Sequence, residues 1–294
     1  MFKSSFTILE NRAILKLSGI DAKSFLQGLV TNDVEKVSEE NTVYTALLTP
    51  QGKYLHDFFI VKIGNKYCLD CEASRVEDLI RRLKIFKLRT NVIIELEKKM
   101  CAVAIYGDRA LEALSLNISL GYSKPYVNGI FYTDPRIESI GARGIVPKTS
   151  IAKLSENDKL KITPYENYDK LRISLGLPDS SRDMRIEKST LLESGFDELN
   201  GVSFNKGCYI GQELTARTKH RGLIKRRLVP IQLKTSQPFE GMTIEQENKE
   251  IGEVRSFQGN WAMAMIRLDA LNRDVDITIN GSPIVIKRPH WAKF

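Results

Sequence analysis

The sequence predicts an α+β protein in which a mixed body is followed by a small antiparallel β-barrel. Over the first 224 residues, β-like alternation and helical spacing follow each other in irregular order, which favours α+β over a regularly alternating α/β fold. From residue 225 the chain changes to short β-like runs separated by Pro, Gly and Asn turn signals, a pattern typical of small barrels. We therefore expect two domains, residues 1–224 with two or more subdomains and residues 225–294 as the barrel.

The opening of the chain predicts a strand, a helix, a hairpin and a second helix. Residues 13–17 alternate like a strand, and Asp21 is a suitable N-cap for a helix with one apolar face. Residues 42–49 and 54–63 are strand-like and flank Pro50-Gln51-Gly52, which supplies the chemistry of a hairpin turn. Residues 75–88 place apolar side chains at helical spacing with basic residues opposite, so an amphipathic helix is expected on the sheet.

The rest of the body continues the mixed pattern. Strands are expected at residues 92–96 and 101–105, with a short helix at 109–114. Thr163-Pro164 is a good helix start, and Gly176 followed by Pro178 is a good stop, so a helix between them should carry Tyr168.

The charge balance favours an anionic partner. The 294 residues include 44 Lys and Arg against 36 Asp and Glu, a formal net charge of +8. A polynucleotide, a phosphate or a polycarboxylate would suit this balance, although a solvated helix face or connector explains each basic run equally well. No apolar run approaches the ~18 residues of a membrane span, and the first residues lack a secretory signal. We expect a cytoplasmic protein with no membrane partner. The basic excess lies in two runs, Arg217, Lys219, Arg221, Lys225, Arg226 and Arg227 in one, and Arg81, Arg82, Lys84, Lys87 and Arg89 in the other.

The segment NKGCYIGQELTAR, residues 205–217, carries the most distinctive chemistry. Lys206 puts a cation beside Cys208, and Gly207 and Gly211 would let the backbone approach a ligand closely. If a helix begins at Gly211, its dipole and Lys206 would both favour the Cys208 thiolate. The alternative is a small buried cysteine in a glycine turn, since free cysteines are commonly buried.

Here the sequence resembles the YgfZ family of folate-binding proteins, which share the fold of the glycine-cleavage aminomethyltransferase. The resemblance rests on KGCYIGQE with TAR and RG after it, on GIDAKSFLQGLVTNDV and YTALLTPQGKYLHDFFIV, and on DPRIESIGAR, in the family's order. It implies an aminomethyltransferase-like, folate-binding body and a role in assembly or repair of iron–sulfur proteins. The signature residues that match are Lys206, Gly207, Cys208, Tyr209, Gly211, Gln212, Glu213 and Arg217.

The resemblance also implies a tetrahydrofolate site. Asp57 matches the aspartate that supports catalysis beside the pterin, Tyr44 matches a pocket tyrosine, and Asn32 and Asp33 match the element beside the folate. A carboxylate can pair with the pterin edge while an aromatic side chain stacks on its ring. Cys208, in the segment characteristic of the family, is the candidate functional thiol. The Gly-Tyr-Thr-Gly-Glu and Ala-Arg-Asp motifs of aminomethyltransferases are absent, which counts against aminomethyl transfer.

No metal site is expected. Cys68 and Cys71 form a CxxC, but a strand would point the two thiols to opposite faces, and no second pair or nearby His completes a zinc set. His56 would likewise point away from Asp57.

Three functions therefore compete. The first is a tetrahydrofolate-binding factor that assists iron–sulfur client or assembly proteins. The second is a folate-dependent aminomethyl or methyl transferase that uses Asp57. The third is a tRNA-associated modification factor, which the basic run from Arg217 favours although no RNA-binding module is evident.

Overall fold

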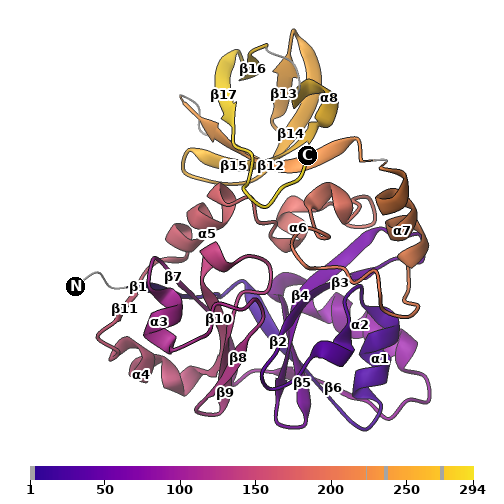
Figure 1. Ribbon diagram of the computed structural model, residues 1–294, viewed down its shortest axis with the longest axis vertical. Helices are drawn as coiled ribbons and strands as arrows, with labels where there is room; N and C mark the ends of the chain where they lie inside the picture. The colour runs from indigo at the N-terminus through magenta and orange to yellow at the C-terminus, as the bar shows by residue number, and fades with distance from the viewer. Residues whose placement is uncertain (1–3, 223, 235–237, 272–274) are drawn as a thin grey trace.

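A computed structural model describes residues 4–222, 224–234, 238–271 and 275–294, and it contains two open sheets and a closed barrel (Figure 1). The order of strands in the first sheet is β3-β4-β5-β2-β6. Helices α1 (Ala22–Leu29) and α2 (Val76–Lys87) pack against it through leucines such as Leu26 and Leu79, as their apolar spacing predicts. The strands of this sheet are β2 (Arg12–Ser18), β3 (Val43–Leu48), β4 (Tyr54–Ile63), β5 (Lys66–Glu72) and β6 (Ile93–Glu97).

The second sheet has the order β11-β1-β7-β10-β9-β8 and draws its strands from distant parts of the chain. Strand β1 (Ser4–Ile8) pairs in parallel with β11 (Leu160–Ile162) and antiparallel with β7 (Met100–Tyr106). Strand β1 was not predicted, because the first strand expected from the sequence begins at residue 13. The remaining strands are β8 (Ser123–Tyr126), β9 (Gly129–Thr133) and β10 (Ala142–Pro147), with helices α3 (Ala110–Leu114) and α4 (Ile151–Ser155) between strands.

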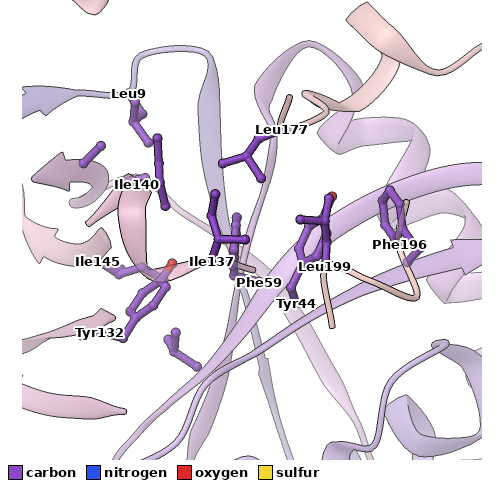
Figure 2. Packing of buried hydrophobic residues seen from close by; sticks show 14 of the residues in the cluster. Leu9, Tyr44, Phe59, Tyr132, Ile137, Ile140, Ile145, Leu177, Phe196 and Leu199 are labelled. Carbon is purple, nitrogen blue, oxygen red and sulfur yellow. The ribbon is translucent and has the colours of Figure 1, made fainter. Parts of the chain in front are cut away.

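The inner faces of the two sheets share one apolar core. Tyr44 and Phe59 from the first sheet meet Tyr132 from the second, with the Phe59 and Tyr132 ring centroids 6.0 Å apart (Figure 2). Phe196, from the segment before α7, packs on Tyr44 with ring centroids 4.9 Å apart. Tyr44, one of the predicted folate residues, therefore lies where the two sheets meet.

The carboxyl-terminal region is a closed antiparallel barrel in the order β12-β15-β14-β13-β16-β17, which confirms the predicted fold class. Helices α5 (Tyr165–Ser174) and α6 (Ser180–Asp183) lie between body and barrel, and α7 (Gln212–Arg221) precedes the first barrel strand (Figure 1). The Trp291 indole donates to the Leu175 carbonyl at 2.8 Å, which ties the chain end to α5. The barrel elements are β12 (Arg226–Leu233), β13 (Thr243–Gln246), β14 (Lys249–Gln258), β15 (Trp261–Arg267), α8 (Leu268–Leu271), β16 (Ile277–Ile279) and β17 (Ser282–Ile286).

Candidate functional site

Asp57 is buried in the core and accepts two tyrosine hydroxyls. Tyr44 donates to Oδ2 at 2.9 Å and Tyr54 donates to Oδ1 at 2.7 Å. Burial raises the pKa of Asp57, while Arg12 and the two hydroxyl donors oppose that rise. His56 points to the opposite side of β4, where its Nε2 lies 3.0 Å from an Asp78 carboxylate oxygen of α2. The alternation of the strand thus separates the two neighbours, as predicted.

Buried arginines surround Asp57, and sequence reasoning gave none of them a role. Arg12 donates to Asp70 Oδ1 at 2.6 Å, and Arg143 donates to Asp70 Oδ2, also at 2.6 Å. The guanidinium of Arg143 lies over the Phe59 ring, 4.3 Å from its centroid, and that of Arg136 lies 5.0 Å from the same ring. Arg136 is paired with Asp134 at 2.8 Å. The segment 134–143 therefore supplies two cations to the core, which pattern reading misses because arginines are mostly exposed.

These side chains fill the space that a pterin would need. A cavity of about 20 Å³ remains beside Asp57, lined also by Arg12, Tyr165, Tyr168 and Asp179. A cavity of this size holds roughly one water molecule. Ligand pockets usually measure ~300–1,000 Å³. The space beside Asp57 is too small for a pterin as the side chains are folded, so we derive no chemical step through tetrahydrofolate there.

Asn32 and Asp33 hold local backbone in place. The Asn32 amide donates to the carbonyls of Tyr44 and Asn200, both at 2.7 Å, and its Oδ1 accepts the Asp33 N–H. Asp33 in turn accepts the Glu35 N–H at 3.1 Å. A surface groove of about 490 Å³ adjoins this element. The residues that line the groove come from four segments and include Asn32, Lys36, Asn41, Tyr44, Leu120, Pro135, Asn200, Phe204 and Asn205.

Lys206 is bound by backbone carbonyls at the end of α1. Its Nζ donates to the carbonyls of Gln27, Val30 and Asn32 at 2.7, 2.7 and 2.8 Å. An ammonium has three donors, and all three are used here. Burial lowers the pKa of Lys206 to about 8. The proposed effect of Lys206 on the Cys208 thiol therefore has no direct contact to support it; the lysine caps a helix.

Gly211 approaches the chain's own backbone rather than a ligand. Its φ is +82°, and a Cβ there would lie 2.5 Å from the Thr49 carbonyl oxygen and 3.0 Å from the Gly52 Cα. Helix α7 begins at Gln212, so Gly211 is its N-cap, and the Gln212 side-chain oxygen accepts the Tyr209 N–H at 3.2 Å. A Cβ at Gly207 would meet no atom within 4 Å, so nothing in the described residues requires glycine there.

Cys208 is exposed, whereas Cys68 and Cys71 are buried and Cys101 is partly buried. Burial raises the pKa of Cys68 to about 11 and that of Cys71 to about 12, so both thiols are protonated at neutral pH. Cys68 faces the core between the sheets and Cys71 faces the helices, as the strand alternation predicts. Among the described residues, no three His, Cys, Asp or Glu side chains gather as a metal site.

The basic run after Arg217 is only partly a surface feature. Arg217, Arg221, Lys225 and Arg226 are exposed. Lys219 pairs with Asp197 at 2.7 Å. Arg227 is buried, pairs with Glu198 and donates to the Leu192 carbonyl at 2.8 Å. Its assignment to a basic surface is therefore wrong, because the first barrel strand turns it toward the body. Tyr209 and Gln212 are partly exposed and Glu213 is exposed.

Comparisons with known proteins agree with this fold. Residues 10–123 match the family described as GCVT N-terminal domain, and residues 225–294 match the CAF17 C-terminal beta-barrel domain. The chain is also similar to the crystal structure of glycine cleavage system aminomethyltransferase T from Bartonella henselae. That likeness has a TM-score of 0.80 at 17% identity and covers 99% of this chain and 87% of that one.

Three relatives carry the name iron-sulfur cluster assembly factor IBA57, two of them outright and the third as a homolog. The human protein is 30% identical over 96% of this chain and 84% of its own length. The mouse protein is 28% identical over 94% and 81%. The Neurospora crassa homolog is 32% identical over 78% of this chain and 53% of its own length, so the match spans about half of that relative.

The same names correct the expected location. All three relatives are named as mitochondrial proteins, so the expectation of a cytoplasmic protein is wrong by this comparison. In the described parts of the chain, none of the helices combines the length and apolar character that crossing a bilayer requires.

Proposed function

Because the chain belongs to the IBA57 family of iron–sulfur cluster assembly factors, we propose that it presents Cys208 as a ligand to a cluster carried by a partner protein. The sequence predicted membership of the YgfZ family. That family is a related one, and the relatives show that the specific family is IBA57. The observation that carries the proposal is the exposure of Cys208 in a chain whose other three cysteines are buried or partly buried. Thiolates are the usual protein ligands of iron–sulfur clusters.

The loop that carries Cys208 is anchored on both sides, which supports a preformed ligand. Lys206 fastens it to α1 through three carbonyls, and Gly211 packs against the hairpin turn at Gly52. A thiol held on a fixed loop loses less conformational entropy on binding than one on a free loop. The partner is then an iron–sulfur assembly or client protein that supplies the remaining ligands.

Complementation tests this proposal in a cell that lacks the native gene. Cys208→Ser keeps the side-chain shape but replaces the thiol, so we expect a folded protein that fails to restore iron–sulfur enzyme activity. Cys101→Ser is the matched control, because Cys101 is partly buried and its thiol contacts the Val146 carbonyl at 3.7 Å. Full rescue by the Cys208 variant would remove the thiol from the mechanism.

Tetrahydrofolate binding stays a prediction of the family resemblance. The carboxylate of Asp57 and the ring of Tyr44 are suitable groups, but they are bonded to each other in a core with little free space. Binding there would require the aromatic and arginine side chains to move apart. A folate-dependent transferase would require the same movement of side chains, so the cluster-assembly role is the function that we favour.

A tRNA-associated role has one supporting observation, the exposed cations Arg217, Arg221, Lys225 and Arg226 on and after α7. Phosphate contacts would make such binding fall steeply with salt. A tRNA-binding curve measured over increasing salt tests it, and Arg221→Gln should lower both affinity and the salt slope. Lys153→Gln, at an exposed position on α4, is the control.

A further inference from the structure

Large apolar side chains are exposed on two turns at one end of the five-stranded sheet. Ile20 lies between β2 and α1 and is 87% exposed. Leu88 follows the last residue of α2 and is also 87% exposed. Ile85 is 60% exposed and Ile93, at the start of β6, is 52% exposed. The core-facing stripe of α2 continues to Phe86, which is 38% exposed, because the helix extends beyond the packed core.

The two turns are fastened to each other. Strand pairing places Ile93 opposite Ser18. The Asn91 N–H donates to the Asp21 carboxylate at 2.7 Å, and a Cβ at Gly19 would lie 2.1 Å from the Asn91 carbonyl oxygen. Asp21 is the N-cap residue of α1, as predicted, but its side chain makes no capping hydrogen bond, and its carboxylate forms this link between the turns. Ile20 and Leu88 are therefore held on adjoining, fixed turns.

Leu88 occupies a backbone conformation that leucine disfavours. Its φ is +42°, in the region that glycine adopts most readily. A glycine would adopt this conformation without the strain, so the backbone conformation at this position does not require leucine.

Several of the basic side chains around these residues have no acidic partner within the described residues. Arg81 and Arg82 pair with Asp78, but Lys84, Lys87 and Arg89 make no ion pair within the described residues. The Asp21 carboxylate, on the turn that carries Ile20, accepts the Asn91 N–H. We call Ile20, Ile85, Leu88 and Ile93, together with Lys84, Lys87 and Arg89, the turn patch.

We propose that the turn patch docks the protein on an anionic lipid surface. Ile20 and Leu88 enter the boundary between headgroups and acyl chains, and the three cations bind lipid phosphates. A second copy of the chain is a poor occupant, because the same cations would face one another. Aliphatic side chains that protrude from turns also suit a fluid interface better than a flat protein surface. The proposal goes beyond the cluster-assembly role and departs from the expectation of no membrane partner.

Vesicle flotation of the full chain tests the proposal. Vesicles of phosphatidylcholine alone are compared with vesicles of equal parts phosphatidylcholine and phosphatidylglycerol. We expect binding to the anionic vesicles only, and release as salt rises from ~0.1 to ~1 M, where the screening length falls from ~10 to ~3 Å. Lys84→Gln and Lys87→Gln should each weaken binding roughly fivefold.

The apolar arm uses Leu88→Gly with Ile20→Ser. The glycine relieves a strained φ, so the melting temperature should not fall because of it, and vesicle binding should drop roughly tenfold or more. Ile118→Ser, which changes a residue 59% exposed outside the patch, is the matched control and should bind like the parent chain.

Two results would overturn the proposal. One is the absence of binding to anionic vesicles by the parent chain. The other is an equal loss from Ile118→Ser and from the patch variants. Binding to a poly-glutamate peptide without vesicle binding would assign the patch to an acidic protein instead.

Discussion

Replacing Lys206 with methionine tests whether the loop that carries Cys208 is fixed by the lysine. The substitution keeps most of the aliphatic stem and removes the ammonium. Three carbonyls at the end of α1 then lose donors that lie 2.7–2.8 Å away. The ammonium also lies 5.2 Å from the Tyr209 ring centroid, so a cation–π contact is lost as well.

The expected cost is about 2–3 kcal/mol of unfolding free energy. Taken singly, a hydrogen bond from a charged donor contributes roughly 1.5–3 kcal/mol to the free energy of unfolding. The three share one ammonium, however, and its burial, which lowers the pKa of Lys206 to about 8, offsets part of their sum. Lys206 still carries its charge at neutral pH, so the contacts remain charge-assisted.

Urea unfolding gives the global cost, and hydrogen exchange of residues 206–211 gives the local one. We expect faster exchange in this loop in the Lys206→Met variant. Lys170→Met, at an exposed position on α5, should leave both measurements unchanged. A cost below about 0.5 kcal/mol with unchanged exchange would refute the reasoning, because deleting charged donors to helix-end carbonyls should be felt.

Three further predictions follow from buried groups. Burial and Arg75 lower the pKa of His56 from 6.5 to about 4, so the unfolded state binds the proton more readily, and stability should fall by about 3 kcal/mol as pH drops through that window. Urea midpoints measured between pH 7 and 4 check this, and His56→Gln should flatten the slope. Gly211→Ala should cost roughly 2 kcal/mol or more in urea unfolding because a Cβ meets the Thr49 carbonyl, whereas Gly207→Ala should cost under about 0.5 kcal/mol; equal costs would contradict the packing argument. If tetrahydrofolate binds in calorimetry, Asp57→Ala should weaken it by about 1–3 kcal/mol, and unchanged affinity would remove Asp57 from the site.

Local patterns predicted the elements whose partners are near in sequence. The hairpin of β3 and β4 follows from strand-like runs on both sides of a Pro and Gly turn, and the structure places β4 at Tyr54–Ile63, as predicted. Helix α2 was expected at 75–88 and spans Val76–Lys87. The missed strand β1 has only five residues, and its partners β7 and β11 begin at Met100 and Leu160. Nothing within a short window signals such a pairing.

The candidate site could be predicted only in part, for the same reason. Motifs singled out Asp57 and Cys208 as site residues, but the surroundings of these residues depend on contacts between distant parts of the chain. Lys206 binds carbonyls more than 170 positions away in sequence. Arg12 and Arg143 meet at Asp70, and charged residues are expected at the surface until a structure shows them paired. Spacing alone cannot reveal either arrangement.

The remote pairing of β1 also sets an order of events during synthesis. Residues 12–97 contain every strand of the five-stranded sheet, so that sheet can form as soon as they leave the ribosome. Strand β1 emerges first but cannot complete its pairing until Leu160–Ile162 is made. At ~5–20 residues per second, the amino-terminal strand waits for several seconds before its antiparallel partner β7 is made, and for several more before β11 is made. A nascent chain stalled once residues 12–97 have left the ribosome, but before β7 has, should therefore hold a protease-resistant first sheet and a cleavable amino terminus.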